Sequence, residues 1–238
     1  MASIPRLRPG APFPPTSRAL DYPSGLLAVG GELTPERLVE AYRQGIFPWY
    51  EPPQPVLWWT PEPRAVLFPE QLHVARSLRR TLRRGSYRVC CDRDFSGVMT
   101  ACAAPRQGVE GTWITGDMLR AYTALHRRGL AHSVELRDAD DQLVGGLYGV
   151  ALGQAFFGES MFSRAPSASR IALVALTRIL SLGGYRLLDC QVESAHLSGM
   201  GATTLSRLDF EALLAQTVEA PADSSVWAFE ANCGELLT

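Results

Sequence analysis

The sequence predicts an α+β fold with a mixed sheet, in which a small N-terminal domain over residues 1–62 precedes a larger domain over 63–238. Residues 1–33 are rich in Pro and Gly and predict an extended lead-in. Strand patterns surround a two-residue turn at 153–154, and an almost wholly apolar helix over 168–182 follows them. Consecutive strands, then a buried helix and another strand, are typical of a mixed sheet covered by helices.

The first helix is expected to begin at Thr34. Threonine is a favoured N-cap, Pro35 suits the first helical position, and Glu36 places an acid in the first turn. Gly45 ends this helix in the position that glycine usually takes. A Pro-rich link and a tryptophan pair then complete the N-terminal domain.

Two further helices precede the main run of strands. Residues 70–84 predict a helix that ends at Gly85, and residues 117–128 predict another that ends at Gly129. The first of these carries arginines along one side, while apolar residues on the other side allow it to dock on the protein.

The larger domain is predicted to hold several strands around one buried helix. Residues 133–137 alternate apolar and polar side chains, as a half-buried strand does. Residues 143–152 predict a long apolar strand, and residues 155–157 begin the next one after the turn. The helix over 168–182 is apolar nearly all round and is therefore expected to be buried, and a buried strand at 187–192 follows it.

The composition excludes several kinds of chemistry. The 238 residues carry a net charge of −1, so any contact with nucleic acid must be local. All 23 Lys and Arg residues are arginine. The absence of lysine excludes a Schiff-base lysine and a phosphate-loop lysine, while arginine is the better fork for phosphate.

Five cysteines, an odd number without a C-x-x-C pair, disfavour a disulfide framework and a zinc site. The first residues lack the apolar core of a signal peptide, and no run approaches the ~18 apolar residues of a membrane span. We therefore expect a cytoplasmic protein with reduced thiols, without a bound metal and without membrane association.

An acid and an amide on the strand at 187–192 are the main candidates for chemistry. Side chains alternate along a strand, so Asp189 and Gln191 are expected on one face and Cys190 on the other. A carboxylate on an apolar strand is costly to desolvate, and such a pair can bind one substrate amine. The alternatives are that Asp189 caps a loop while Gln191 bonds to backbone, or that Cys190 is a thiol nucleophile paired with His196. Burial of free cysteines is common and disfavours the last.

Glu159 is a third candidate, because it follows an apolar segment at an expected strand end. The alternative is a helix cap or an ion pair with Arg164.

Two features suit a nucleic acid. Five arginines gather near the helix at 70–84 with few acids nearby, so the stripe either binds an anion such as phosphate or is a solvated face: Arg76, Arg79, Arg80, Arg83 and Arg84. Tryptophans are usually core residues, but one or two can stack on a base: Trp49, Trp58, Trp59 and Trp113.

Ordered blocks along nearly the whole chain together resemble one family. They include Tyr42-Arg43-Gln44-Gly45-Ile46-Phe47-Pro48-Trp49, Trp58-Trp59-Thr60-Pro61-Glu62-Pro63-Arg64, Gly111-Thr112-Trp113-Ile114, Gly158-Glu159-Ser160-Met161-Phe162-Ser163 and Leu188-Asp189-Cys190-Gln191. The chain resembles the bacterial leucyl/phenylalanyl-tRNA–protein transferases. The segment 201–207 departs from the family pattern, because it lacks the acid and Pro usual before its Arg.

The resemblance implies a small N-terminal domain followed by an acetyltransferase-like domain. It also implies that Leu, Phe or sometimes Met moves from its tRNA to the N-terminal Arg or Lys of an acceptor protein, which marks that acceptor for degradation. No cofactor and no metal are expected, and the chain is expected to act as a monomer.

The family's functional positions carry over to particular residues of this chain. The resemblance places Asp189, Gln191 and Glu159 in the catalytic site. It assigns the aminoacyl-adenosine pocket to five residues: Trp49, Trp113, Tyr122, Leu147 and Phe156, the Leu standing where the family often has Met. It places Arg76, Arg80, Arg83 and Arg84 on a basic helix that contacts tRNA.

An aminoacyl ester is already activated, so the protein must supply position, a neutral amine and stabilisation of an oxyanion. We expect Asp189 and Gln191 to orient and help deprotonate the acceptor amine, and Glu159 to hold the basic acceptor residue or to steady the amine. Two roles for Asp189 remain open here, a general base or an orienting group beside a ribose hydroxyl that shuttles the proton.

Two other functions compete with this one. A coenzyme-A-dependent N-acetyltransferase needs a Q/R-x-x-G-x-G/A loop, and the nearest string, at 126–131, has His in the first position. A non-catalytic tRNA-binding module would keep the arginines but would not need the acid–amide pair.

Overall fold

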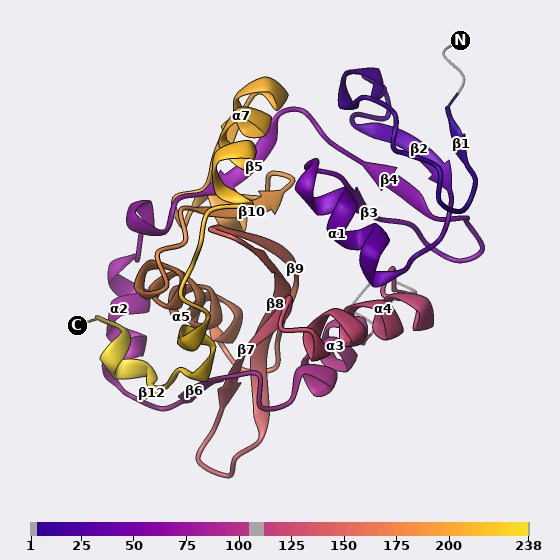
Figure 1. Ribbon diagram of the computed structural model, residues 1–238. Coiled ribbons are helices and arrows are strands. Elements are labelled where there is room, and N and C mark those ends of the chain that lie inside the picture. The colour runs from indigo at the N-terminus through magenta and orange to yellow at the C-terminus, as the bar shows by residue number, and fades with distance from the viewer. Residues whose placement is uncertain (1–3, 105–111, 238) are drawn as a thin grey trace.

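The computed structural model describes residues 4–104 and 112–237. Helices pack on both faces of a large mixed sheet, and a smaller sheet lies beside it (Figure 1). The predicted α+β fold with a mixed sheet is therefore confirmed. Gly111, the first residue of one block of the resemblance, lies outside the described residues.

The smaller sheet has four strands in the order β1-β2-β4-β3. Helix α1 packs against α4 of the larger part, and Tyr42 of α1 lies on the ring of Phe157 with centroids 4.9 Å apart. The Thr34 hydroxyl accepts a hydrogen bond from the Arg37 N–H at 3.2 Å, so α1 begins at the predicted cap. The elements of this part are β1 (Arg6–Leu7), β2 (Leu26–Gly30), α1 (Pro35–Arg43), β3 (Phe47–Pro48) and β4 (Leu57–Trp59).

The larger sheet has eight strands in the order β11-β5-β10-β9-β8-β7-β6-β12. Its neighbours are antiparallel except for β9 and β10, which run parallel. The strands are β5 (Arg64–Leu67), β6 (Arg88–Cys91), β7 (Ala131–Arg137), β8 (Leu143–Leu152), β9 (Ala155–Ser163), β10 (Leu187–Gln191), β11 (Thr203–Leu205) and β12 (Glu230–Asn232).

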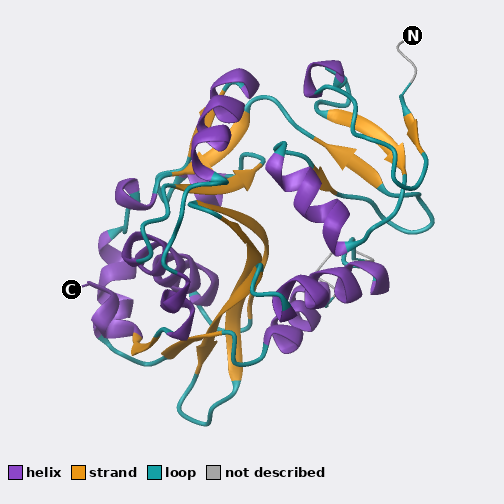
Figure 2. Cartoon of the chain, viewed as in Figure 1, coloured by secondary structure: helices purple, strands orange, loops and turns teal. Residues whose placement is uncertain are grey.

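Helices cover the two faces of this sheet separately (Figure 2). Helices α2 (Arg76–Arg83) and α5 (Ala168–Leu182) share one apolar core with one face, while α3 (Phe95–Ala103), α4 (Gly116–Arg127) and α1 share another core with the opposite face. The remaining helices are α6 (Ala195–Ser198) and α7 (Arg207–Thr217), with short 3-10 turns at Thr16–Arg18, Pro69–Gln71, Ser224–Ala228 and Cys233–Leu237.

Most predicted elements are present, and two differ in extent. The strand over 143–152 and the helix over 168–182 coincide with β8 and α5. The predicted helix over 70–84 is shorter, because Leu72 is extended with ψ 122° and the next N–H, of His73, donates to the Met200 carbonyl at 2.9 Å. The strand that begins at Ala155 continues to Ser163, so Glu159 lies within a strand rather than at its end.

The parallel pair β9 and β10 separates part-way along its length. Pairing runs from Leu187 opposite Ala155 to Asp189 opposite Phe157 and then stops. Beyond that point β9 continues against β8, while β10 stays paired with β5. Close approach of β8 to β9 requires glycine at one position, because a Cβ at Gly149 would lie 2.2 Å from the Phe157 carbonyl oxygen.

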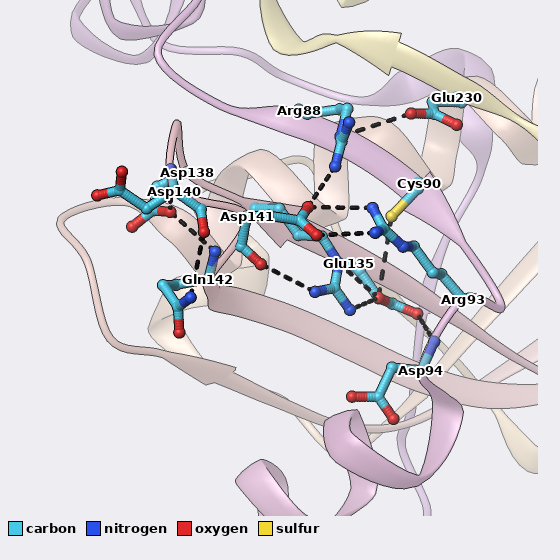
Figure 3. A network of polar contacts seen from close by, with 11 residues as sticks. Arg88, Cys90, Arg93, Asp94, Glu135, Asp138, Asp140, Asp141, Gln142 and Glu230 are labelled. Atoms are coloured by element: carbon cyan, nitrogen blue, oxygen red, sulfur yellow. Dashed lines mark hydrogen bonds and ion pairs between the residues drawn. The ribbon is translucent and has the colours of Figure 1, made fainter.

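A buried acid organises the polar network at the β6–β7 side of the sheet (Figure 3). Glu135 is fully buried and accepts hydrogen bonds from Arg137 Nη2 at 2.7 Å and from the Asp94 N–H at 2.5 Å. Arg137 also donates to the Asp141 carbonyl at 3.0 Å, and the Asp141 carboxylate pairs with Arg93 at 2.7 Å. This network ties the turn between β7 and β8 to the start of α3.

Replacing Glu135 with Ala is expected to lower the free energy of unfolding by about 3–5 kcal/mol, because it leaves the buried Arg137 without its partner. The control is Glu230→Ala, which removes an exposed ion pair with Arg88 at 3.5 Å and is expected to cost less than about 1 kcal/mol. Urea denaturation of both variants measures the difference, and equal losses would contradict the buried role of Glu135.

Candidate functional site

A cavity of about 410 Å³ lies where β10 separates from β9. Its walls come from residues 158–161 of β9 and residues 189–192 at the end of β10. Leu173 and Leu176 of α5 add an apolar side, and Trp49 and Glu51 of the N-terminal part lie along another side. The cavity therefore joins both parts of the chain.

Glu159 is held by three hydrogen-bond donors from distant parts of the sequence. The hydroxyls of Tyr42 and Tyr122 donate to its two oxygens at 2.6 and 2.8 Å, and Gln191 Nε2 donates at 3.1 Å. Burial raises the pKa of the Glu159 carboxyl to about 7, and nearby Asp189 acts in the same direction, while the three donors oppose the shift. The carboxyl is thus poised to gain or lose a proton near neutral pH.

The two tyrosines and Glu159 form a closed ring of short contacts. The hydroxyl oxygens of Tyr42 and Tyr122 are 2.5 Å apart, in addition to their contacts with the carboxylate. Burial raises the pKa of both tyrosines well above the usual range, so each keeps its single proton. Three contacts need three protons and the hydroxyls supply two, so a proton on Glu159 completes the ring.

Asp189 forms a buried ion pair with Arg64. Arg64 Nε and Nη2 donate to the two carboxylate oxygens at 2.8 and 2.6 Å, and neither side chain is more than 1% exposed. Arg64 Nη1 also donates to the Gly45 carbonyl at 2.9 Å. The carboxylate expected to face an incoming amine is thus already engaged on both oxygens, which suits a positioning role and disfavours a general base.

Gln191 departs from regular strand geometry. Its φ is +65° and a bulge lies between Asp189 and Gln191, so strand alternation does not place these two side chains together as expected. Contacts join them instead, because the Gln191 N–H donates to Asp189 Oδ1 at 2.9 Å while its amide reaches Glu159. The result is a continuous chain from Arg64 through Asp189 and Gln191 to Glu159.

The expected substrate-pocket residues divide into two groups. Trp49, Trp113 and Leu147 line the cavity. Phe156 does not line it, because its ring is fully buried beside Trp227 with centroids 5.5 Å apart. Tyr122 is also fully buried and reaches the site through its hydroxyl on Glu159 rather than as a pocket wall.

Three contributors to the site were not singled out from the sequence. Arg64, Tyr42 and Glu51 lie within or beside blocks of the resemblance, but no role was assigned to them. Arg64 directly precedes the apolar run at 65–67, and an arginine in a buried strand needs an acidic partner. That partner is Asp189. For Tyr42 the sequence holds no comparable signal, because its partners lie 80 and 117 positions away.

Residues 66–215 match the family described as leucyl/phenylalanyl-tRNA protein transferase, and residues 31–62 match the N-terminal domain of that family. A transferase of this name from Nitrosomonas eutropha is 55% identical over 92% of this chain and 93% of its own length. One from Pseudomonas putida is 56% identical over 90% of this chain and 94% of its own. The chain belongs to the leucyl/phenylalanyl-tRNA protein transferase family.

The expected family resemblance is thereby confirmed. Among solved structures, that of L-PGS from Bacillus licheniformis aligns with a TM-score of 0.40 and 11% identity, over 71% of this chain and 53% of the other. This similarity is too low to assign a shared fold to the transferase.

The predicted tRNA-contacting arginines of the transferase lie at or beside α2. All four are exposed, and none forms an ion pair with another described residue: Arg76, Arg80, Arg83 and Arg84. Leu78 and Leu82 are buried on the other side of the helix, as its amphipathic pattern predicts.

The thiol alternative finds no support in the geometry. Cys190 Sγ donates to the Leu188 carbonyl at 3.8 Å, and burial raises the pKa of this thiol, which disfavours a thiolate. Within residues 4–104 and 112–237, no three His, Cys, Asp or Glu side chains gather as metal ligands would. In the same residues no helix is long and apolar enough to span a membrane.

Glu159 is expected to make stability depend on pH. Its pKa in the folded protein, about 7, lies above the usual 4.5, so the folded state binds more protons than the unfolded chain between these values. Its contribution to stability is therefore greatest below about pH 4.5 and declines as pH rises to 7, by about 3 kcal/mol. Denaturant titrations should show this decline in the wild type relative to Glu159→Gln, and parallel pH curves would contradict the assignment.

Proposed function

We propose that this transferase moves Leu, Phe or Met from aminoacyl-tRNA to the N-terminal Arg or Lys of an acceptor protein, which marks that protein for degradation. The single observation that carries the proposal is the mostly apolar cavity whose wall holds the Glu159–Gln191 pair. The direct test mixes the protein with radiolabelled Leu-tRNA and a peptide that begins with Arg. Absence of labelled peptide would refute the proposal.

The apolar side of the cavity is the place for the transferred side chain. It is built mainly from leucines and one methionine: Leu147, Leu173, Leu176, Leu188 and Met161. Such a wall rejects charged side chains but separates Leu from Met by only ~1–3 kcal/mol. Trp49 and Trp113 offer flat faces on which the terminal adenosine of the tRNA stacks.

The amine of the acceptor attacks the ester carbonyl, a peptide bond forms, and the ester oxygen of the ribose leaves. Glu159 and Gln191 orient the amine, and Glu159 accepts its proton. A pKa of about 7 lies close to the ~7.7–8.0 of an N-terminal amine, so this transfer is nearly balanced. The proton completes the ring of hydrogen bonds with Tyr42 and Tyr122, and it then passes from Glu159 to the ribose oxygen as that oxygen leaves, which restores the carboxylate.

In this proposal Asp189 acts through Gln191. Its carboxylate, fixed by Arg64, accepts the Gln191 N–H and so sets the direction of the amide side chain. This division of roles replaces the expectation that Asp189 itself deprotonates the amine.

We also propose a two-domain organisation with a boundary at 62/63, an acetyltransferase-like larger domain, monomeric action and a cytoplasmic location. Support for the boundary is that the smaller sheet ends at Trp59 and the larger begins at Arg64. The rival coenzyme-A reaction lacks a phosphate loop at 126–131, which holds the end of α4 and the start of β7.

Replacing Gln191 with Ala is expected to lower the rate constant of transfer by about 10²-fold, because it removes the donor that holds Glu159 and the amine in line. The dissociation constant of Leu-tRNA should stay within about two-fold, since phosphate contacts dominate tRNA affinity. Single-turnover transfer and filter binding separate the two quantities. Cys190→Ser is the matched neighbour and should retain transfer, whereas equal losses of transfer and binding in Gln191→Ala would refute the assignment.

The arginines of α2 are expected to act through phosphate. Replacing Arg76, Arg80 and Arg83 together by Ala should weaken tRNA binding and reduce the slope of log affinity against log salt by about 2 to 3. Binding measured from low to high salt tests this, and the peptide KM serves as the control that should not move. An unchanged salt slope would remove α2 from the tRNA-binding surface.

A further inference from the structure

Acidic residues line the cavity. They are Glu51, Glu159 and Asp189, and none of its described lining residues is Arg or His. A cavity lined in this way attracts cations and amines rather than anions.

Two of these carboxylates are already engaged inside the protein. Asp189 receives both hydrogen bonds of the Arg64 fork. Glu159 receives the hydroxyls of Tyr42 and Tyr122 and the amide of Gln191. Neither therefore offers both oxygens to the fork of a guanidinium group, although Glu159 Oε2, which accepts the hydroxyl of Tyr122, can still take a proton from an amine. These contacts disfavour Glu159 as the group that holds the basic acceptor residue.

Glu51 differs from both. Its carboxylate accepts no hydrogen bond and forms no ion pair with any residue in the described part of the chain, and the residue is exposed. Its main chain belongs to a turn, in which the Glu51 N–H donates to Gln54 Oε1 at 3.0 Å and the Gln54 N–H donates to the Glu51 carbonyl at 2.8 Å. Glu51 is thus an exposed acid that lines the cavity and has no partner among the described residues.

An aromatic face lies on the same side of the cavity. Trp49 is 46% exposed, lines the cavity and is held by a hydrogen bond from Trp59 Nε1 to its carbonyl at 2.6 Å. Glu51 thus lies beside the tryptophan proposed for adenosine, and its carboxylate matches a guanidinium group, which forms charge-assisted hydrogen bonds with carboxylates.

From these contacts we infer that Glu51 is a specificity-determining residue that binds the cationic side chain of the acceptor's first residue. The inference rests on the proposed function and adds to it. The Glu159–Gln191 pair receives the α-amine, while Glu51 receives the side chain of the same residue, so an N-terminal Arg or Lys is chosen by charge.

The test compares two peptides that differ only in charge, one beginning with Arg and one with citrulline, its neutral isostere. With Leu-tRNA as donor, the wild type should prefer the Arg peptide. Glu51→Gln should raise the KM of the Arg peptide about five-fold and bring the Arg-to-citrulline ratio of kcat/KM towards one. The kcat and the KM of Leu-tRNA should not change, because Glu51 touches neither the reacting atoms nor the tRNA body.

Glu193→Gln is the matched control. Glu193 is exposed and follows Gln191 by two residues, but it is not among the residues that line the cavity. This variant should keep the wild-type preference for Arg. An unchanged Arg-to-citrulline ratio in Glu51→Gln, or an equal loss in Glu193→Gln, would overturn the assignment of Glu51.

A second measurement does not depend on turnover. Titration of each peptide into wild type and Glu51→Gln, followed by tryptophan fluorescence, reports binding through Trp49. Tighter binding of the Arg peptide than of the citrulline peptide in the wild type, lost in Glu51→Gln, supports the inference. If the wild type transfers no leucine but shows this difference, the proposed function fails while the role of Glu51 stands. Equal binding of both peptides by the wild type overturns the role of Glu51.

Discussion

The buried ion pair between Arg64 and Asp189 is the constraint on which the geometry of the site depends. Removing two charges from water costs about as much as their attraction returns, so such a pair adds little net stability. Its effect is positional, because Arg64 also donates to the Gly45 carbonyl and lies over the rings of Phe47 and Phe210. One guanidinium group thus holds β5, β10, the end of α1 and α7 in a single arrangement.

The ion pair determines where the polar part of the cavity lies. Asp189 Oδ1 accepts the Gln191 N–H, and Gln191 adopts a left-handed conformation with φ +65°. A non-glycine residue in this region is strained by roughly 1–2 kcal/mol, so the surrounding hydrogen bonds must hold it there. In this conformation the side-chain amide of Gln191 donates a hydrogen bond to Glu159 of the neighbouring strand β9. The left-handed conformation of Gln191 therefore makes its hydrogen bond to Glu159 possible.

Local patterns were sufficient for much of the fold but not for the site. The strand β8 and the helix α5 follow from uninterrupted apolar runs, whose signal lies within the element itself. The helix predicted over 70–84 is interrupted after the 3-10 turn at Pro69–Gln71, where a distant carbonyl, that of Met200, accepts the N–H of His73. The strand β9 was predicted too short because its residues that face the cavity, such as Glu159, interrupt the apolar pattern. Polar side chains at a functional site break the apolar pattern by which a strand is predicted.

Asp189 and Glu159 show why residue identity alone could not predict how each acid of the cavity behaves. Asp189 and Glu159 are both acids on neighbouring strands, and no pattern in the sequence indicates which of them has a proton to exchange near neutral pH. Their surroundings separate them, since Asp189 faces a guanidinium while Glu159 faces two hydroxyls and an amide and has a pKa of about 7. Environments that divide two acids in this way give them different protonation behaviour, which is the basis of the roles proposed for them. The partners that make the difference, Arg64 and the two tyrosines, come from three separate segments and meet only in the folded chain.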